Sequence, residues 1–507
     1  MAAIANSTRP EQVAGKASGA LAFYGLIWRS LGLLLPVWLH WRAHRGKEDR
    51  QRLGERYGKT ALPRPAGTVV WLHAASIGES VSALVLANAL LAARPGLQLL
   101  LTSGTVTSAM MISRAITAHP AADQLRHQFQ PLDHPAWIAR FLEHWKPQLA
   151  VMLESDFWPG IISGCRQHGI PVGLASAQVS PRSMARWQGL GRHLGNQLFP
   201  QLATVLAADE TNADRFRLLA ESTATVAAAS IPIAAMGSLK AAAPPLPVNA
   251  GYCDGLRQAA AGLPVAARQP AKAHFKQQDQ LENPYSGSRL VLLLASSHQG
   301  EEAYLLDSLQ LIESLPPVLV IIAPRHPHRG AALAEAISKR GMVTTRRSTS
   351  GLPDSTTECW LADSLGEMGS LLVASDIVIM GGGFMPHGGH NPMEAAAHGR
   401  GVISGHHVDK NRAAFGQLQA AGGVILTTSR QQLAEAITSQ LDPAARARLG
   451  HAAASCYTGA KDAAEDTARQ LLCLLEDSRH QQAGQAAMDH STTQPTEDYA
   501  AGGRPAP

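Results

Sequence analysis

Two blocks of alternating apolar runs and amphipathic segments constrain the fold of this 507-residue chain more than any other feature. The first block begins after Pro65 with TVVWLHA and ends with ATVLAAD at residue 209. The second begins with RLVLLLASSH (289–298) and ends with VILTT at residue 428. Short apolar runs separated by helix-length segments are typical of parallel strands joined by helices. We therefore predict an α/β protein with two doubly wound domains, because a chain of this length is too long for one ordinary core.

The segments outside the two blocks set the expected domain boundaries. Residues 241–288 are rich in Ala, Pro and Gln, which indicates an irregular insertion, and the last residues are polar and rich in Pro and Gly, which indicates disorder. We predict six segments. In chain order they are an N-terminal tail (1–18), a membrane anchor with a basic flank (19–60), an N-terminal Rossmann-like domain (61–220), a linker with the insertion (221–288), a C-terminal Rossmann-like domain (289–476) and a disordered tail (477–507).

The composition narrows the classes of partner. A net charge of +5 and a pI near 9.0 suit anionic partners. Because no arginine-rich arm or aromatic-basic interleaving is present, we expect no nucleic acid among them. Five cysteines without a CxxC pair fit a reducing compartment and argue against zinc held by thiolates.

The N-terminal segment predicts contact with a membrane. Gly19–Trp41 is almost wholly apolar and about long enough to cross a bilayer, but Arg29 and Pro36 interrupt it. Arg42–Lys59 holds seven Lys and Arg against three acids, the mark of a cytoplasmic flank. We predict an anchor in the inner (cytoplasmic) membrane with the body of the protein on the cytoplasmic side. Whether the anchor spans the bilayer or lies in its interface stays open, and an ordinary buried helix is the alternative.

A glycine-rich stretch, GGGFMPHGGHNPMEAAAHG (Gly381–Gly399), predicts a phosphate-binding turn. The apolar run before it reads as a strand, and after it Asn391 stands at an N-cap position, Pro392 at the first helical position and Glu394 in the first turn. The start of such a helix offers free N–H groups to an anion. A flexible linker is the alternative.

Two charged residues stand where parallel strands should end. Glu79 opens the segment after TVVWLHA, and Arg325 follows VLVIIAP. Catalytic and binding groups gather at such strand ends, and a guanidinium grips phosphate well. The alternatives are a helix-dipole partner for Glu79 and a structural ion pair for Arg325. The HxxH of His387 and His390 lacks further ligands, so we predict no metal.

A series of motifs resembles one enzyme family. In chain order, RLGERYG, HAASIGES, LESDFWPG, GSLK, ASSHQGEE, APRHPHR, ADSLGEM and PHGGHNPMEAAAHG are similar to the motifs of the 3-deoxy-D-manno-octulosonic acid (Kdo) transferases of lipopolysaccharide synthesis. The resemblance extends from Leu21 to Glu476. It implies a GT-B glycosyltransferase with two facing domains, of which the N-terminal one binds the acceptor and the C-terminal one binds CMP-Kdo. Such an enzyme transfers Kdo from CMP-Kdo to a lipid A precursor of the lipid IVA type, inverts the anomeric centre and needs no metal or cofactor.

The same resemblance assigns roles to individual residues. Glu79 matches the catalytic base, and Glu154 and Lys240 match positions that stabilise the transition state. Without the resemblance, a solvated or ion-paired carboxylate and a solvated lysine are the simpler interpretations of these last two. The CMP-binding positions are Pro324, Arg325, Leu365, Gly366, Glu367, Asn391, Pro392, Met393 and Glu394.

The chain departs from the family pattern at three places. Ser155-Asp156 stands where the family usually has Thr-Glu, Ser238 stands where it usually has Asn, and residues 241–288 replace a shorter segment. Two other functions remain as alternatives: a GT-B transferase that uses a UDP-sugar, and a membrane-tethered nucleotide-binding protein without turnover. The sequence leaves open the number of Kdo units transferred and the oligomeric state.

Overall fold

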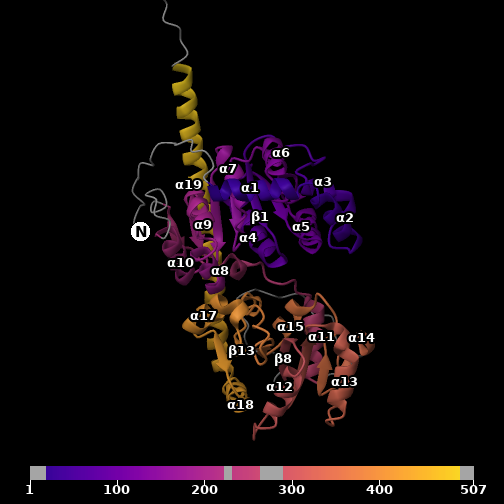
Figure 1. Cartoon of the computed structure of the whole chain (residues 1–507). Helices are drawn as coiled ribbons and strands as arrows, with labels where there is room; N and C mark the ends of the chain where they lie inside the picture. The colour runs from indigo at the N-terminus through magenta and orange to yellow at the C-terminus, as the bar shows by residue number, and fades with distance from the viewer. Residues whose placement is uncertain (1–18, 222–230, 263–288, 492–507) are drawn as a thin grey trace, which may run out of the picture. The chain divides into compact units, whose positions relative to one another are not determined.

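The computed structural model describes residues 19–221, 231–262 and 289–491, which form two compact units (Figure 1). The first unit comprises Met1–Met236 and Glu465–Pro507, and the second comprises Gly237–Ala464. The expected N-terminal tail, most of the expected insertion and the last sixteen residues of the expected C-terminal tail (492–507) lie outside the described residues.

The first unit is built on a parallel sheet with the strand order β3-β2-β1-β4-β5-β6-β7. Its central strands β1, β4 and β5 are fully buried and mostly apolar, as expected for a sheet covered on both faces. They are β1 (Val69–Ala74), β2 (Gln98–Ser103), β3 (Leu125–Phe129), β4 (Leu149–Leu153), β5 (Val172–Ala177), β6 (Thr204–Ala207) and β7 (Ile233–Ala235).

Helices connect these strands, and aromatic side chains fill the space between helices and sheet. Trp71 on β1 is fully buried, with its ring 4.7 Å from that of Phe141. The helices are α4 (Ile77–Ala93), α5 (Val106–Ala118), α6 (Pro135–Trp145), α7 (Pro159–Gln167), α8 (Pro181–Gln188), α9 (Arg192–Leu198) and α10 (Glu210–Glu221).

The second unit repeats the plan, with the strand order β10-β11-β9-β8-β12-β13-β14, again all parallel. Its strands are β8 (Leu290–Ser297), β9 (Val318–Pro324), β10 (Thr344–Arg346), β11 (Cys359–Leu361), β12 (Ile377–Met380), β13 (Val402–Gly405) and β14 (Val424–Thr427). Its helices are α11 (Ala250–Ala260), α12 (Glu301–Leu309), α13 (Gly330–Ser338), α14 (Arg347–Ser350), α15 (Met368–Ala374), α16 (Met393–Ala396), α17 (Arg412–Ala421), α18 (Arg430–Ser439) and the start of α19 (Pro443–Ser491).

The unit boundaries differ from the expected ones. β7 joins the first sheet and α11 packs into the second core, although both lie in the segment expected to be a linker. α19 begins in the second unit, and from Glu465 onward it belongs to the first, where Leu471 lies against Gly173. The tail expected to be disordered from residue 477 is helical as far as Ser491.

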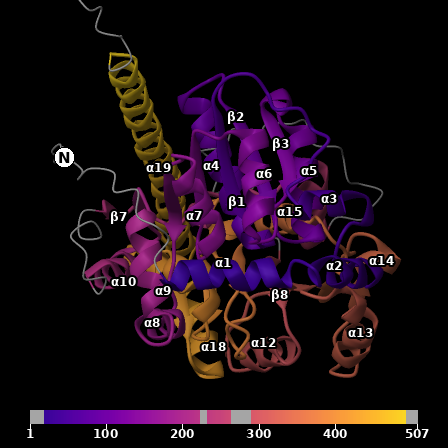
Figure 2. The same ribbon diagram turned by 45° about the horizontal axis from the view of Figure 1, so that its top comes forward.

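The N-terminal segment forms two helices, α1 (Gly19–Leu31) and α2 (Leu35–His44), followed by the single turn α3 (Leu53–Arg56). Among the described residues no single helix is long and apolar enough to cross a membrane. α1 and α2 together have the length and composition, but they are bent by 63°. α1 packs on α6, α7 and α9, and the Tyr24 hydroxyl donates a hydrogen bond to Asp133 at 2.7 Å (Figure 2).

Candidate active site

Glu79 lies at the carboxyl edge of the first sheet, in the first turn of α4. Its Oε2 accepts hydrogen bonds from the backbone N–H groups of Ala75 at 2.7 Å and Ser76 at 3.0 Å. The Ser76 side chain accepts the Glu79 N–H in return, which completes a capping box. The side chain is therefore held in one orientation, and it keeps 9% of its surface exposed.

Two further acidic residues, Glu154 and Asp156, follow the neighbouring strand β4. Glu154 has φ of 56°, a strained value for a residue with a side chain, and its Oε1 accepts a hydrogen bond from the Ser82 hydroxyl on α4 at 2.8 Å. Asp156 Oδ2 accepts the same Ala75 N–H as Glu79, at 2.9 Å. Burial and the adjacent Glu79 raise the pKa of Asp156 to about 8. The structure thus brings three acidic side chains together.

The basic flank after α2 is partly buried, and two of its arginines form ion pairs within the first unit. Arg56 is only 4% exposed and pairs with Glu48 at 3.0 Å, and its guanidinium also donates to the carbonyl oxygen of Gly104. Arg52 forms a bidentate ion pair with Glu55. These contacts fix the flank to the carboxyl edge of the sheet, because Gly104 follows β2 and packs against Ala75.

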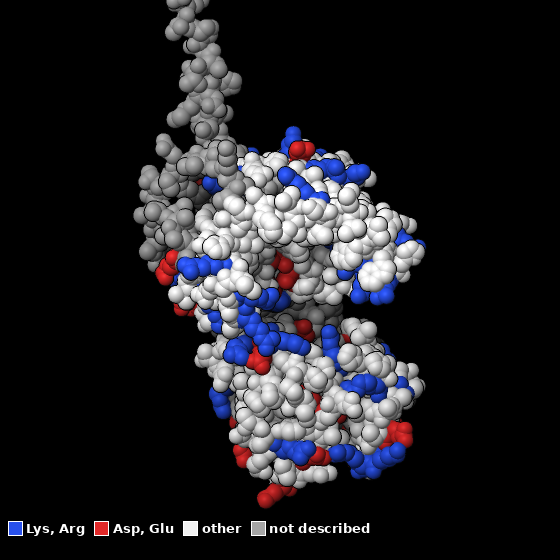
Figure 3. All heavy atoms as spheres, viewed as in Figure 1, with Lys and Arg blue, Asp and Glu red and all other residues white. Residues whose placement is uncertain are grey.

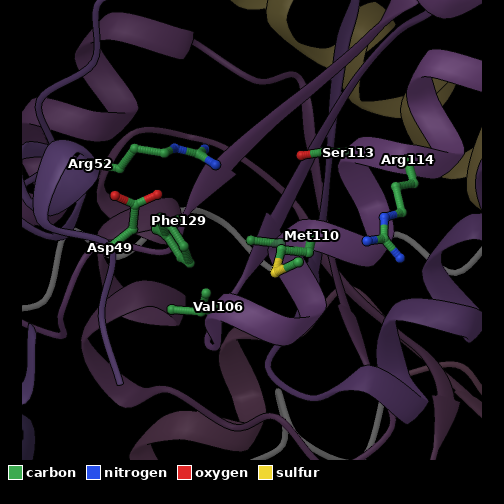
Figure 4. A pocket seen from close by; sticks show the side chains of 8 residues that line it. Asp49, Arg52, Val106, Met110, Ser113, Arg114 and Phe129 are labelled. Carbon is green, nitrogen blue, oxygen red and sulfur yellow. The ribbon is translucent and has the colours of Figure 1, made fainter. Parts of the chain in front are cut away.

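A cavity of about 310 Å³ opens beside this flank (Figure 4). Val106 at the start of α5 and Phe129 at the end of β3 form part of its wall, so it lies at the same edge of the sheet as Glu79. Arg52 and the exposed Arg114 contribute positive charge, while Met110 adds apolar surface. The remaining lining residues are Asp49, Ala109 and Ser113.

In the second unit, Arg325 is exposed at the carboxyl end of β9. In the part of the chain that the structure describes, no ion pair engages Arg325, whereas its neighbour Arg329 pairs with the buried Glu302 at 3.0 Å. The structural ion pair considered for Arg325 is thus made by Arg329. Burial raises the pKa of Glu394, and the nearby Arg325 opposes that shift, so the two residues lie in one region.

In the glycine-rich stretch, two backbone N–H groups that were expected to face an anionic ligand are hydrogen-bonded within the protein. The carboxylate of the fully buried Glu301 accepts the N–H groups of Gly382 at 2.8 Å, Phe384 at 3.1 Å and His298 at 2.8 Å. The glycines also permit close packing, since a Cβ on Gly383 would lie 2.9 Å from the carbonyl oxygen of Gly405. The prediction that these N–H groups face an anion is wrong for Gly382 and Phe384.

The helix after this stretch, α16, is a single turn rather than the longer helix expected. Its N-cap is Pro392 rather than the expected Asn391, although the Asn391 Oδ1 accepts the Met393 N–H at 3.1 Å and so supports the start of the turn. Gly399, at φ of +67°, ends the turn. Pro392 and Met393 are buried, so their side chains face the core and only their backbone is available to a ligand.

The remaining expected nucleotide-binding residues form a loop after β11. Leu365 is 82% exposed and Gly366 adopts φ of +87°. Glu367 forms a bidentate ion pair with Arg347, at 2.8 and 3.0 Å, and accepts the Tyr252 hydroxyl at 3.2 Å. Although burial opposes ionisation, the hydrogen bonds from Arg347 keep the pKa of Glu367 below its usual value. Lys240 belongs to the second unit, in the short turn Leu239–Ala242.

Comparison with known proteins identifies the family. Residues 51–239 match the family model described as 3-Deoxy-D-manno-octulosonic-acid transferase (kdotransferase). The chain is 31% identical over 410 residues to a probable mitochondrial 3-deoxy-D-manno-octulosonic acid transferase of Arabidopsis thaliana, covering 80% of this chain and 84% of that protein. It is 30% identical over 465 residues to the 3-deoxy-D-manno-octulosonic acid transferase of Bordetella pertussis, covering 90% and 98%. The chain belongs to the Kdo transferase family.

The resemblance found from the motifs is thereby confirmed, and the protein is a glycosyltransferase. The solved UDP-GlcNAc 2-epimerase of Neisseria meningitidis matches 80% of this chain and 100% of its own length, with a TM-score of 0.50 and 14% identity. At that identity the match concerns the fold alone. It agrees with the GT-B architecture of two parallel α/β units predicted for this Kdo transferase family member.

Sequence reasoning missed two residues that shape the site of this Kdo transferase. Asp156 shares a donor with Glu79, and Glu301 holds the glycine-rich stretch. Their places in the sequence could have indicated them, because both follow the end of a strand. Asp156 lies three residues beyond the end of β4, and Glu301 lies four residues beyond the end of β8. Among the described residues, no group of three or more His, Cys, Asp or Glu is arranged to hold a metal ion.

Proposed function

We propose that this Kdo transferase moves Kdo from CMP-Kdo to a lipid A precursor of the lipid IVA type in lipopolysaccharide core synthesis, inverting the anomeric centre without a metal. One observation carries the proposal: an oriented carboxylate, Glu79, stands at the carboxyl edge of the first sheet, where catalytic groups of α/β proteins gather. Membership of the Kdo transferase family identifies Kdo as the sugar that is transferred.

The reaction needs a base and a means of stabilising charge. The acceptor hydroxyl attacks the anomeric carbon of Kdo, the bond from that carbon to the phosphate oxygen breaks, and CMP leaves with the bonding electrons. Glu79 takes the hydroxyl proton. Glu154 supports the positive charge that develops on the sugar, and Lys240 supports the negative charge on the departing phosphate.

The donor is assigned to the carboxyl edge of the second sheet. Arg325, exposed and without an ion pair among the described residues, suits a phosphate group. The exposed Leu365 and the adjacent Gly366 offer apolar surface and backbone to the nucleoside. Asn391 and Glu394 complete the set, together with the backbone of Pro324, Pro392 and Met393, whereas Glu367 acts by positioning through Arg347.

The acceptor is assigned to the cavity beside the basic flank. A lipid A precursor carries phosphate groups on sugars with acyl chains, and this cavity combines the cations Arg52 and Arg114 with the apolar Met110 and Phe129. Its place at the edge that also holds Glu79 supports the assignment.

The N-terminal helices are assigned to the interface of the inner membrane, on its cytoplasmic side. The exposed side chains of α1, α2 and the turn between them include Phe23 (64%), Leu33 (86%) and Val37 (71%). The guanidinium groups of Arg42 and Arg45 lie over the rings of Trp38 and Trp41, at 4.8 and 4.1 Å. Apolar side chains beside Trp and Arg are typical of helices that lie in a membrane interface, and the bend of 63° favours that arrangement over a straight span.

Mass spectrometry tests the reaction directly. Purified protein incubated with CMP-Kdo and detergent-dispersed lipid A precursor should give acceptor mass increased by one or more Kdo units, and CMP should be released. Thermal protection of the protein by UDP but not by CMP would favour the alternative UDP-sugar transferase. Tight binding of CMP-Kdo without any transfer would favour the non-catalytic alternative.

A further inference from the structure

One backbone N–H group in the first unit donates hydrogen bonds to two carboxyl groups. The Ala75 N–H is 2.7 Å from Glu79 Oε2 and 2.9 Å from Asp156 Oδ2. Because an amide has a single hydrogen, both oxygens must lie on the same side of it and next to each other. The two carboxyl groups are thus close enough to share a proton, and burial followed by the charge of Glu79 raises the pKa of Asp156.

The surroundings oppose two negative charges at this place. Glu79 is 9% exposed, and the Asp156 side chain is 12% exposed. Glu154, 7% exposed, acts on Asp156 as a third negative charge. Two adjacent carboxylates with little access to water cannot both ionise readily, so such pairs hold one proton.

The histidine beside the pair does not neutralise it. Trp71 Nε1–H donates to Thr102 Oγ1 at 2.8 Å, which leaves the Thr102 hydroxyl hydrogen for His73 Nδ1, also at 2.8 Å. The hydrogen of the neutral ring is then on Nε2, 3.4 Å from Asp156 Oδ2. Complete burial, followed by the charge of Arg56, lowers the pKa of His73 to about 3. His73 thus places no positive charge beside Asp156, and its Nε2 makes no hydrogen bond among the described residues.

We propose that Asp156 carries a proton at neutral pH and donates it in a hydrogen bond to Glu79, so that the two residues act as one base with a single negative charge. The proposal rests on the proposed role of Glu79. Asp156 is a positioning residue in it, since only Glu79 takes the acceptor proton. The pair holds one proton before the transfer and two after it, and the second proton passes to water when the product leaves.

A single charge on the pair suits the donor proposed above. CMP-Kdo carries a phosphate and the sugar carboxylate, both negative, and its anomeric carbon must come close to the base for transfer. A pair with two charges would repel such a donor. We therefore expect kcat/KM for CMP-Kdo to fall as pH rises through about 8, where Asp156 loses its proton.

The test compares pH profiles of the full-length protein and three variants. Asp156→Asn offers an N–H to Glu79 and an oxygen to Ala75 without a titrating proton, so it should retain turnover at neutral pH within roughly tenfold and lose the alkaline fall. Asp156→Ala removes the side chain that positions Glu79, so we expect kcat to fall by about 10²-fold. Asp209→Asn is the matched control, because Asp209 is a carboxyl at another helix start of the same unit, where it accepts the Asn212 N–H. It should keep the wild-type profile.

Infrared difference spectra of the free protein at neutral pH supply a readout without turnover. The C=O stretch of a protonated carboxyl group should be present in the wild type and in Asp209→Asn, and absent from Asp156→Asn. Persistence of that band in Asp156→Asn, or an alkaline fall unchanged by that substitution, would overturn the proposal. Full activity of Glu79→Gln would overturn the base itself, while the infrared band would still decide whether Asp156 holds the proton.

Discussion

At the residue scale, Glu79 combines two tasks that the sequence presented as alternatives. It caps α4 through the N–H groups of Ala75 and Ser76, and the same contacts orient its carboxylate for the proposed role of base. A loss of activity on substitution therefore needs a control that disturbs only the cap. Ser76 offers one, because its side chain completes the capping box without belonging to the proposed chemistry.

We expect Glu79→Gln to lower kcat by roughly 10²-fold or more, the usual range for loss of a general base. The amide oxygen still accepts the two N–H groups, so CMP binding and the melting temperature should change little. Ser76→Ala should cost about 1 kcal/mol of unfolding free energy, as loss of an N-cap does, with kcat nearly unchanged. Enzyme kinetics and calorimetry on the same preparations check both. Equal kcat losses in the two variants would contradict the base assignment.

Arg325 permits a similarly controlled test of donor binding. Arg325→Ala should weaken CMP-Kdo binding by about 1.5–3 kcal/mol, the contribution of a hydrogen bond to a charged group, while the fold remains intact. Isothermal titration with CMP measures the effect. Arg329→Ala is the control, since it leaves Glu302 buried without its partner and should lower the melting temperature instead. An Arg325→Ala variant with wild-type affinity would remove this residue from the donor site.

At the scale of elements, the buried glycine-rich stretch depends on Glu301. We expect Glu301→Gln to destabilise the second unit by about 1–3 kcal/mol, because an amide nitrogen would face backbone N–H groups that now have a carboxylate acceptor. The affinity for CMP should also fall, because the glycine-rich stretch leads into Asn391 and Glu394. Denaturant unfolding and CMP titration measure the two effects. The exposed Glu313→Gln in the same unit should change neither, and a fully stable Glu301→Gln would contradict this role.

Elements with strong apolar patterns could be predicted, and weakly patterned ones could not. β1, β8 and β12 are continuous apolar runs, and each lies where the sequence placed it. β3 has the sequence LRHQF, in which the polar residues bond to neighbours rather than to water, as His127 does to Ser103. α19 was missed because alanines such as Ala453 and Ala468 form much of its buried surface, and they leave no distinct hydrophobic stripe.

The same distinction between predictable and unpredictable features holds for the residues of the candidate site. The positions of Glu79 and Arg325 at strand ends could be predicted, but the contacts that hold Glu79 and the glycine-rich stretch could not. Asp156 and Glu301 act through contacts between segments 81 residues apart in each case, with Ala75 and Gly382. Such distant hydrogen bonds follow from the packing of the whole unit, which no local pattern encodes.

At the scale of the whole molecule, the N-terminal helices determine how a membrane contact can be tested. Deletion of residues 1–41, the direct test of an anchor, would also remove the fully buried Leu39 and the hydrogen bond from Tyr24 to Asp133. The loss of membrane binding could then follow from damage to the first unit. Substitution of exposed side chains separates the two effects. In Figure 3 the face of the first unit that carries α1 bears few charges, and Lys and Arg side chains gather near α2.

We therefore expect the double substitution Leu33→Asp, Val37→Asp to release the protein from vesicles containing anionic lipid. Both side chains are highly exposed, at 86% and 71%, so the melting temperature should stay near that of the wild type, while burial of charge in the interface becomes costly. Leu218→Asp is the matched control, an exposed leucine (51%) on α10 of the same unit, and it should remain bound. Flotation of the vesicles measures binding. If the protein acts at the membrane surface, transfer to acceptor embedded in vesicles should fall with binding, while transfer to detergent-dispersed acceptor should persist. Undiminished flotation of the double variant would exclude α1 and α2 as the membrane contact.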